Sequence, residues 1–202
     1  MKDRLARTLI ERAAAKGLLP PGGTVVEYTA GTTGISLAFV ARALGYKTHF
    51  AFSDAFSDEK RWTMRAFGAE ITDVPSDNKM ITKELIHAMI AKAGEISKQP
   101  GHWWADQLQN EDGAAGYHGL GDEIWRQTHG KIDEVLTVST ADAKAMARRL
   151  AKEEAIFAGT STGANIVAAL RIAGRLGSAA TVATLVVDSG LRYLSTNVFR
   201  GA

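Results

Sequence analysis

The sequence of 202 residues contains no cysteine. This absence excludes a disulfide framework, a thiol nucleophile and a cysteine-based zinc site, and it fits a reducing cytoplasmic compartment. No apolar run is long enough to span a bilayer, because Arg42 interrupts the run that begins at Ile35. Residues 1–7 lack the apolar core of a secretory signal. We therefore expect a cytoplasmic protein with no membrane partner.

The sequence also lacks an excess of charge of one sign. It has 24 lysines and arginines against 22 aspartates and glutamates, so its formal net charge is +2. Both signs are interspersed, and no basic stripe is available for nucleic acid. The five histidines show no metal-ligand spacing. We expect neither a nucleic-acid partner nor a metal, and a globular chain of one large or two small domains.

Short apolar segments alternate with helical patterns along the chain. Strands are predicted at residues 24–28, 47–53, 70–74, 134–138 and 181–187. Helices are predicted at about residues 5–14, 35–44, 57–67 and 81–93, before Gly130, after the capping box at 139–142, and from Ala164. This alternation predicts an α/β fold with a three-layer, mostly parallel, doubly wound sheet. Because ligands bind beyond the carboxyl ends of such strands, we expect residues 29–34, 159–163 and 188–190 to converge.

Residues 29–34, Thr-Ala-Gly-Thr-Thr-Gly, form the most informative of these loops. A β-branched strand leads into the loop and a helical pattern follows at once, so backbone N–H groups and a helix N-terminus point at one place. The loop matches neither G-x-G-x-x-G nor a Walker A sequence, which disfavours a Rossmann-like nucleotide domain. Small hydroxyl side chains suit the carboxylate of an amino-acid-like molecule. The structural alternative is a tight turn that needs glycine for a positive φ.

Several motifs in order resemble the cysteine synthase family of pyridoxal phosphate enzymes, also called the tryptophan synthase β-like or fold type II family. Lys2-Asp3-Arg4 resembles the family's S-x-K-D-R segment, whose lysine binds the cofactor covalently, and residues 29–34 resemble its T-S-G-N-T-G loop. Residues 64–70 match a structural junction, Gln107 lies where the family has a substrate-facing glutamine, and residues 159–163 and 188–195 resemble the G-I-S-S-G loop and the segment against the pyridine nitrogen.

The resemblance implies the residues of a site for pyridoxal 5'-phosphate and an amino-acid substrate. Lys2 would be catalytic and bind the cofactor, and Thr32 replaces the family's longer asparagine near the cofactor ring oxygen. Either Asp188 or Ser189 would face the pyridine nitrogen; only a carboxylate would keep that nitrogen protonated. The substrate-binding residues would be Thr29, Ala30, Gly31, Thr33, Gly34, Gln107, Gly159 and Thr160. The alternatives are a solvated lysine, a loop glutamine and an ordinary Asp-Ser-Gly turn.

Two departures accompany the resemblance. The family carries two strands before its lysine, whereas this sequence begins one residue before Lys2. The family's G-T-G-G-T loop, which cradles the cofactor phosphate, has no counterpart between Gly130 and Thr160. The sequence thus resembles a truncated fold type II enzyme without its front segment and a large middle block. We expect a smaller α/β domain at residues 5–108, with residues 1–4 and 109–202 forming the remainder of the larger cofactor domain.

Two hypotheses of function follow. The first is a cysteine synthase-like transferase or lyase of amino-acid biosynthesis, which replaces or eliminates the β-substituent of an O-activated serine. The resemblance implies an acetylated serine as the typical substrate and a sulfur nucleophile. The second is a cofactor-free pseudoenzyme that acts as a binding module, because the aligned N–H groups of the missing cradle would supply much of the cofactor's binding. Missing strands would expose sheet edges, so we expect a homodimer.

Overall fold

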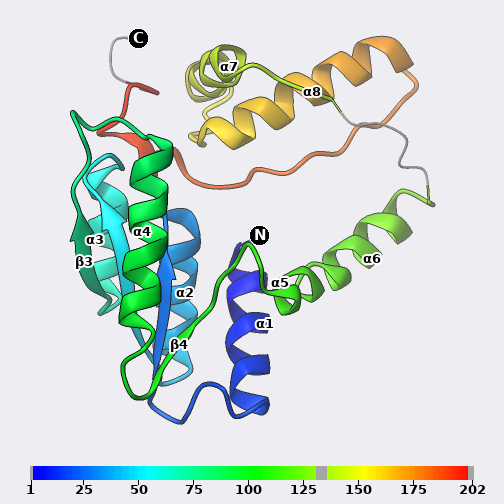
Figure 1. Cartoon of the computed structure of the whole chain (residues 1–202). Coiled ribbons are helices and arrows are strands. Elements are labelled where there is room, and N and C mark those ends of the chain that lie inside the picture. Colours follow the sequence, from blue (N-terminus) through cyan, green and yellow to red (C-terminus); the bar gives the residue numbers. More distant parts are fainter. Residues whose placement is uncertain (1, 131–135, 200–202) are drawn as a thin grey trace. The chain divides into compact units, whose positions relative to one another are not determined.

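The computed structural model describes residues 2–130 and 136–199 (Figure 1). The chain divides into two compact units, Met1–Ile132 and Asp133–Ala202. The first unit contains α1 (Lys2–Ala15), β1 (Thr24–Tyr28), α2 (Thr32–Ala43), β2 (Lys47–Ser53), α3 (Asp58–Ala66), β3 (Glu70–Val74), α4 (Lys83–Ile96), β4 (His102–Trp104), α5 (Glu111–Ala115) and α6 (His118–Gln127). The second contains α7 (Thr140–Glu153), α8 (Thr160–Leu176) and the short 3₁₀ helix η1 (Gly190–Tyr193).

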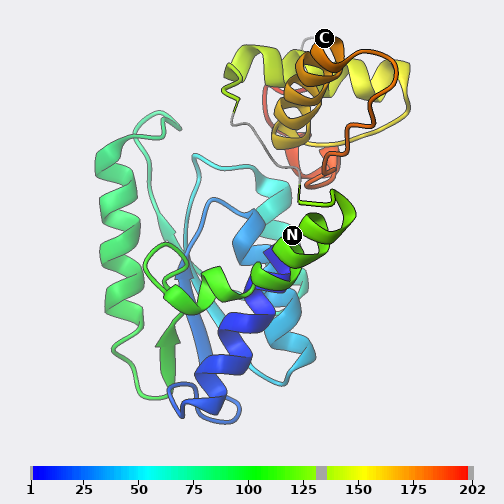
Figure 2. The same ribbon diagram turned by 90° about the vertical axis from the view of Figure 1, so that its right-hand side faces the viewer.

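The first unit is built on a parallel sheet in the order β3-β2-β1-β4. Helices α1 and α2 cover one face and α4 covers the other, as Figure 2 shows. Successive side chains of a strand point to opposite faces, so Val25 joins the core under α1 and α2 whereas Val26 joins the core under α4. The three-layer α/β prediction is confirmed for this unit, and the carboxyl ends of β1 and β4 meet at one edge.

The strands predicted at residues 24–28, 47–53 and 70–74 are confirmed. Strand β4 was not predicted, since it has three residues and its aromatic pair carries no alternating pattern. It forms because β1 supplies the partner, with Val26 paired to Trp104. Two helices begin earlier than predicted, α2 at Thr32 and α8 at Thr160, so both small-residue loops contribute to a first helical turn.

The strands predicted in the second unit are wrong for the residues that the structure describes. Residues 181–187 form no strand, and Val186 is 60% exposed. Of residues 134–138, the part from 136 to 138 is not a strand either, and residues 134–135 lie outside the described residues. A β-branched segment becomes a strand only where a neighbour completes the hydrogen-bond ladder. The described part of this unit offers no such neighbour.

The second unit is a helical pair, α7 packed against α8. The N-cap predicted from the capping box is confirmed, because Ser139 Oγ accepts the N–H of Asp142 at 3.0 Å. The boundary between the units falls between residues 132 and 133, within the segment where the sequence predicts the loss of a middle block. The predicted division into residues 5–108 and the remainder stays a prediction. Among the described residues, none of the helices combines the length and apolarity that a membrane crossing requires.

Candidate functional site

The loop after β1 is organised around a buried threonine. Thr29 is 2% exposed. Its hydroxyl oxygen accepts the backbone N–H groups of Gly31 at 3.0 Å and of Gly34 at 3.1 Å. Its own N–H donates to the carbonyl of Ala51 in β2 at 3.2 Å. The Thr29 side chain therefore fixes the shape of the loop. Because the N–H groups of Gly31 and Gly34 are engaged by it, the donors available to a ligand are the other backbone N–H groups nearby.

Those donors lie in the first turn of α2. Gly31 precedes the helix with φ 126°, a conformation that L side chains rarely adopt, and the Lys60 side chain packs where a Cβ would project. The backbone N–H groups of Thr32 and Thr33 come in the first turn, where no carbonyl of the helix itself can accept them. Together with the positive end of the helix dipole, they favour an anion at this point.

Gln107 reaches the same point from the loop after β4. The Thr33 hydroxyl donates to Gln107 Oε1 at 2.7 Å. Since its amide oxygen is engaged in this way, Gln107 presents its side-chain NH₂ as a donor. The sequence resemblance predicted that Gln107 and residues 29–34 belong to one site, and the structure places them in hydrogen-bond contact.

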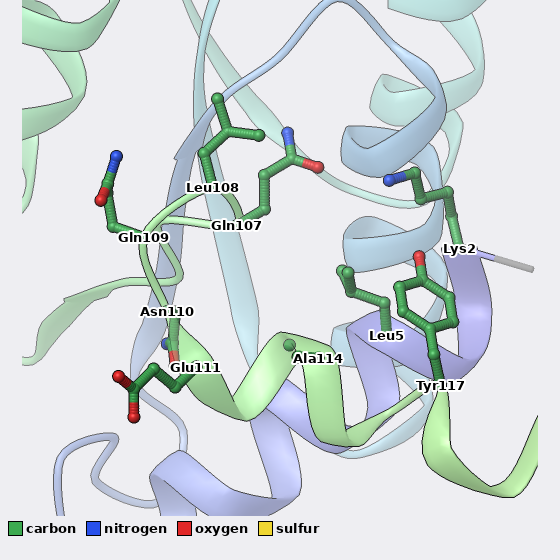
Figure 3. A pocket seen from close by; sticks show the side chains of 10 residues that line it. Lys2, Leu5, Gln107, Leu108, Gln109, Asn110, Glu111, Ala114 and Tyr117 are labelled. Carbon is green, nitrogen blue, oxygen red and sulfur yellow. The ribbon is translucent and has the colours of Figure 1, made fainter. Parts of the chain in front are cut away.

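Lys2 lies beside Gln107. As the first residue of α1, it lines a cavity of about 410 Å³ together with Leu5, Gln107, Leu108, Gln109, Asn110, Glu111, Gly113, Ala114 and Tyr117. Figure 3 shows the Lys2 amine, the Gln107 amide and the Tyr117 hydroxyl directed toward this space. The half-buried position of Lys2 differs from the solvated lysine that was its structural alternative.

Glu27 is a functional candidate that the sequence reasoning did not single out. The residue is fully buried in β1. Its Oε1 accepts the N–H of Tyr28 at 2.9 Å and Nε1 of Trp104 at 3.3 Å, and its Oε2 accepts the backbone N–H of Gln107 at 2.9 Å. Burial raises the pKa of Glu27 to about 7, although these hydrogen bonds oppose the shift. The signal in the sequence was a lone charge within an apolar strand.

The other two predicted loops meet each other in the second unit. The N–H of Gly159 donates to the carbonyl of Asp188 at 3.2 Å, and the N–H of Gly190 donates to the carbonyl of Phe157 at 3.0 Å. Thr160 is the first residue of α8, which follows directly. The sequence thus correctly placed residues 159–163 and 188–190 side by side.

The two candidates for the pyridine nitrogen differ in what their side chains do. Asp188 Oδ2 accepts the Tyr193 hydroxyl at 2.8 Å, whereas Asp188 Oδ1 is buried and has no hydrogen-bond partner in the described part of the chain. Ser189 Oγ accepts the N–H of Leu191 at 3.2 Å and caps η1. A buried carboxylate oxygen without a donor fits a protonated ring nitrogen, so the residues present suit this part of pyridoxal phosphate.

Comparison with known proteins gives one consistent result. The model of the family described as pyridoxal-phosphate dependent enzyme matches residues 1–136. Cysteine synthase from Staphylococcus aureus is 30% identical over 98% of this chain and 84% of its own length. Cysteine synthase B from Salmonella typhimurium is 31% identical with the same coverage of both chains. The crystal structure of O-ureido-L-serine synthase matches with a TM-score of 0.83 and 28% identity, over 100% of this chain and 84% of that one.

The comparison also bears on the predicted internal loss. The alignment with the Staphylococcus aureus cysteine synthase extends over 269 positions, although this chain has 202 residues. That relative therefore carries internal residues with no counterpart here. The family match ends at residue 136, close to the boundary between the two units. That the missing block includes the phosphate cradle stays a prediction.

Proposed function

Because the chain belongs to the pyridoxal-phosphate dependent enzyme family and is cysteine synthase-like, we propose that it replaces or eliminates the β-substituent of an O-activated serine. Pyridoxal 5'-phosphate is the cofactor of the family. One observation carries the proposal: Lys2 and Gln107 line the same cavity, and Gln107 is hydrogen-bonded to Thr33 in the first turn of α2. The proposed covalent attachment point and the proposed carboxylate site would therefore lie together, as chemistry on an amino acid requires.

The carboxylate of the substrate would bind at the start of α2. The N–H groups of Thr32 and Thr33 and the NH₂ of Gln107 supply donors of fixed direction. Ala30, Gly31 and Gly34 would shape the turn around them, and Thr29 would hold it closed.

Lys2 would hold the cofactor, which when bound supplies an electron-withdrawing ring that stabilises charge at the substrate's α-carbon. Asp188 is the better candidate for the ring nitrogen, because its Oδ1 has no donor among the described residues while the Ser189 hydroxyl caps a helix. Thr32 would approach the ring oxygen, and Gly159 and Thr160 would line the substrate side of the second unit. Gly159 suits this place because a side chain there would collide with Asp188 and Tyr193.

Covalent labelling tests the proposal. The purified chain is mixed with pyridoxal 5'-phosphate, reduced with borohydride, digested and mapped by mass spectrometry. We expect the label on Lys2, and we expect Lys2→Ala to abolish it. Lys83→Ala is the matched control, since Lys83 also opens a helix but is exposed and lies outside the cavity. Label spread over the chain's terminal amine and its surface lysines would contradict the assignment.

The second candidate function is a pseudoenzyme that binds an amino acid or peptide without turnover. The observation in its favour is the internal gap in the alignment with cysteine synthase, together with the absence of a G-T-G-G-T sequence between residues 130 and 160. Binding of L-serine to the chain without cofactor, combined with no specific label at Lys2, would support it.

We propose a homodimer in the cytoplasm for either function. Large apolar side chains on the first unit support association, since Phe39 is 50% and Trp62 is 61% exposed. Light scattering at micromolar concentration is the direct test. A monomer at every concentration would contradict the proposal.

A further inference from the structure

The carboxyl group of Glu27 occupies an unusual place for an acidic side chain. It lies near the carboxyl end of β1, an interior strand of the sheet with β2 on one side and β4 on the other. Glutamate is almost never fully buried unless its charge is compensated. The Glu27 carboxyl acts as the acceptor in each of its hydrogen bonds, which come from the N–H groups of Tyr28 and Gln107 and from the indole of Trp104. This environment is built for an acceptor.

The contacts of Glu27 lead directly to the carboxylate site. Glu27 Oε2 accepts the backbone N–H of Gln107, and the Gln107 side-chain oxygen accepts the Thr33 hydroxyl. Gln107 is therefore fixed from two sides, its backbone by β1 and its side chain by α2. The loop that carries Gln107 begins where β4 ends at Trp104, so Glu27 bonds with the last residue of the strand and with the loop that follows.

We propose that Glu27 is a positioning residue, whose ionised carboxylate fixes the Gln107 loop so that the Gln107 amide donates to an amino-acid carboxylate, and whose protonation releases that loop. The inference rests on the proposed function and deepens it, because it makes substrate binding depend on the ionisation of a group that does not touch the substrate.

The ionisation behaviour of Glu27 supports this role. Burial raises its pKa to about 7, and the negative charge of Asp106, on the loop after β4, acts in the same direction. The neighbouring Tyr28 phenol has a raised pKa from burial, from Glu27 and from Asp106. A protonated carboxyl carries an O–H donor on one oxygen and keeps only part of its acceptor capacity, so it holds the N–H groups that point at it less strongly. The change falls within the neutral pH range.

The first measurement needs no substitution. The backbone amide of Gln107 is followed by ¹H–¹⁵N NMR and hydrogen exchange between pH 5.5 and 8.5 without ligand. We expect its resonance to titrate with a midpoint near 7 and its protection to increase with pH. A flat resonance over this range would overturn the proposal, whatever the chain binds.

The second measurement uses L-serine as the probe, titrated into the cofactor-loaded chain. At pH 8 we expect Glu27→Gln to weaken L-serine binding roughly tenfold, because a hydrogen bond to a charged acceptor is replaced by a weaker one to a neutral acceptor. The variant should also lose the part of the pH dependence that is centred near 7. Glu70→Gln is the matched control, because Glu70 is also in a strand of the sheet but its side chain is 73% exposed and lies outside the cavity.

A double-mutant cycle separates positioning from general damage to the fold. In a Gln107→Ala background, Glu27→Gln should produce no further loss of L-serine affinity, since the residue that it positions is gone. Fully additive losses would overturn the positioning role while leaving the proposed function intact. A wild-type chain that binds cofactor but fails to bind L-serine would instead contradict the proposed function itself.

Discussion

The two units of this chain respond differently to the same kind of sequence. Residues 24–28 (Thr-Val-Val-Glu-Tyr) and residues 181–187 (Thr-Val-Ala-Thr-Leu-Val-Val) are both rich in β-branched residues. The first segment is a buried strand between two parallel neighbours, whereas the second is largely exposed and forms no strand. Strand formation here is a property of the neighbours more than of the segment. The described part of the second unit gives residues 181–187 no strand to pair with.

We expect the largest difference in stability between the units when a large apolar side chain is truncated to alanine in each of them. Phe50 of β2 is fully buried, and Leu185 is 42% exposed. Phe50→Ala should lower the free energy of unfolding by about 3–5 kcal/mol, and Leu185→Ala by no more than about 0.5 kcal/mol. Urea unfolding followed by tryptophan fluorescence and by far-UV circular dichroism gives both values. Similar losses from the two substitutions would contradict the contrast between the units.

The second effect concerns pH and is confined to the first unit. Because the folded-state pKa of Glu27, about 7, exceeds its ordinary value of 4.5, the folded state binds this proton more tightly than the unfolded state. The stability that protonation contributes is present at low pH and is lost as the pH rises through about 7. The full loss, reached well above pH 7, amounts to about 3 kcal/mol.

Glu27→Gln should remove this component. The comparison of wild type with variant at pH 5.5 and pH 8 isolates it from other groups, such as His49, whose pKa is lowered by burial and whose contribution runs in the opposite direction. An identical pH dependence of the free energy of unfolding in wild type and Glu27→Gln would show that the carboxyl is not the buried group described here.

Two helical glycines give the third contrast. A Cβ on Gly34 of α2 would press on Met64 and Thr29, while a Cβ on Gly174 of α8 would meet no other part of the described residues within 4 Å. Gly34→Ala should therefore destabilise the first unit by about 1–3 kcal/mol and weaken L-serine binding. Gly174→Ala should stabilise its helix by about 0.5–1 kcal/mol. Denaturant unfolding measures both; a stabilising Gly34→Ala would contradict the close packing of the loop.

Much of the first unit could be predicted from the sequence because the segments with the apolar pattern of a strand do pair with neighbouring strands in the structure. Strands β1, β2 and β3 follow directly from that pattern. Strand β4 could not be found, since three residues carry too little periodicity and its pairing with β1 joins segments far apart in the chain. The strand predicted at residues 181–187 is wrong because the segment has the composition of a strand, but the described part of the second unit offers no sheet that it could join.

Only part of the candidate site could be predicted from the sequence. Lys2 and Gln107 are far apart in the sequence, and only the family resemblance predicted that they belong together. In the structure they line the same cavity. Glu27 was visible as a single acid in an apolar strand, but its contacts with Trp104 and Gln107 depend on how β4 pairs. Asp188 and Ser189 could not be distinguished by spacing, and the difference became visible only in their hydrogen bonds.

The smallest expected effect comes from removing a helix N-cap, and we expect the same loss of stability in both units. Thr82 Oγ1 caps α4 by accepting the N–H of Leu85 at 3.1 Å, and Ser139 Oγ caps α7 by accepting that of Asp142 at 3.0 Å. Thr82→Ala and Ser139→Ala should each lower the free energy of unfolding by about 1 kcal/mol. Far-UV circular dichroism during urea unfolding reports both. A loss confined to one variant would show that one of the caps is absent in solution.

Turnover is the most direct test of the central claim that the cavity at Lys2 is an active site. The cofactor-loaded chain is supplied with O-acetyl-L-serine and sulfide, and free L-cysteine is quantified by mass spectrometry. We expect L-cysteine formation by the wild type and by Lys83→Ala, and none above background by Lys2→Ala. Equal product from wild type and Lys2→Ala, or none from either, would contradict it.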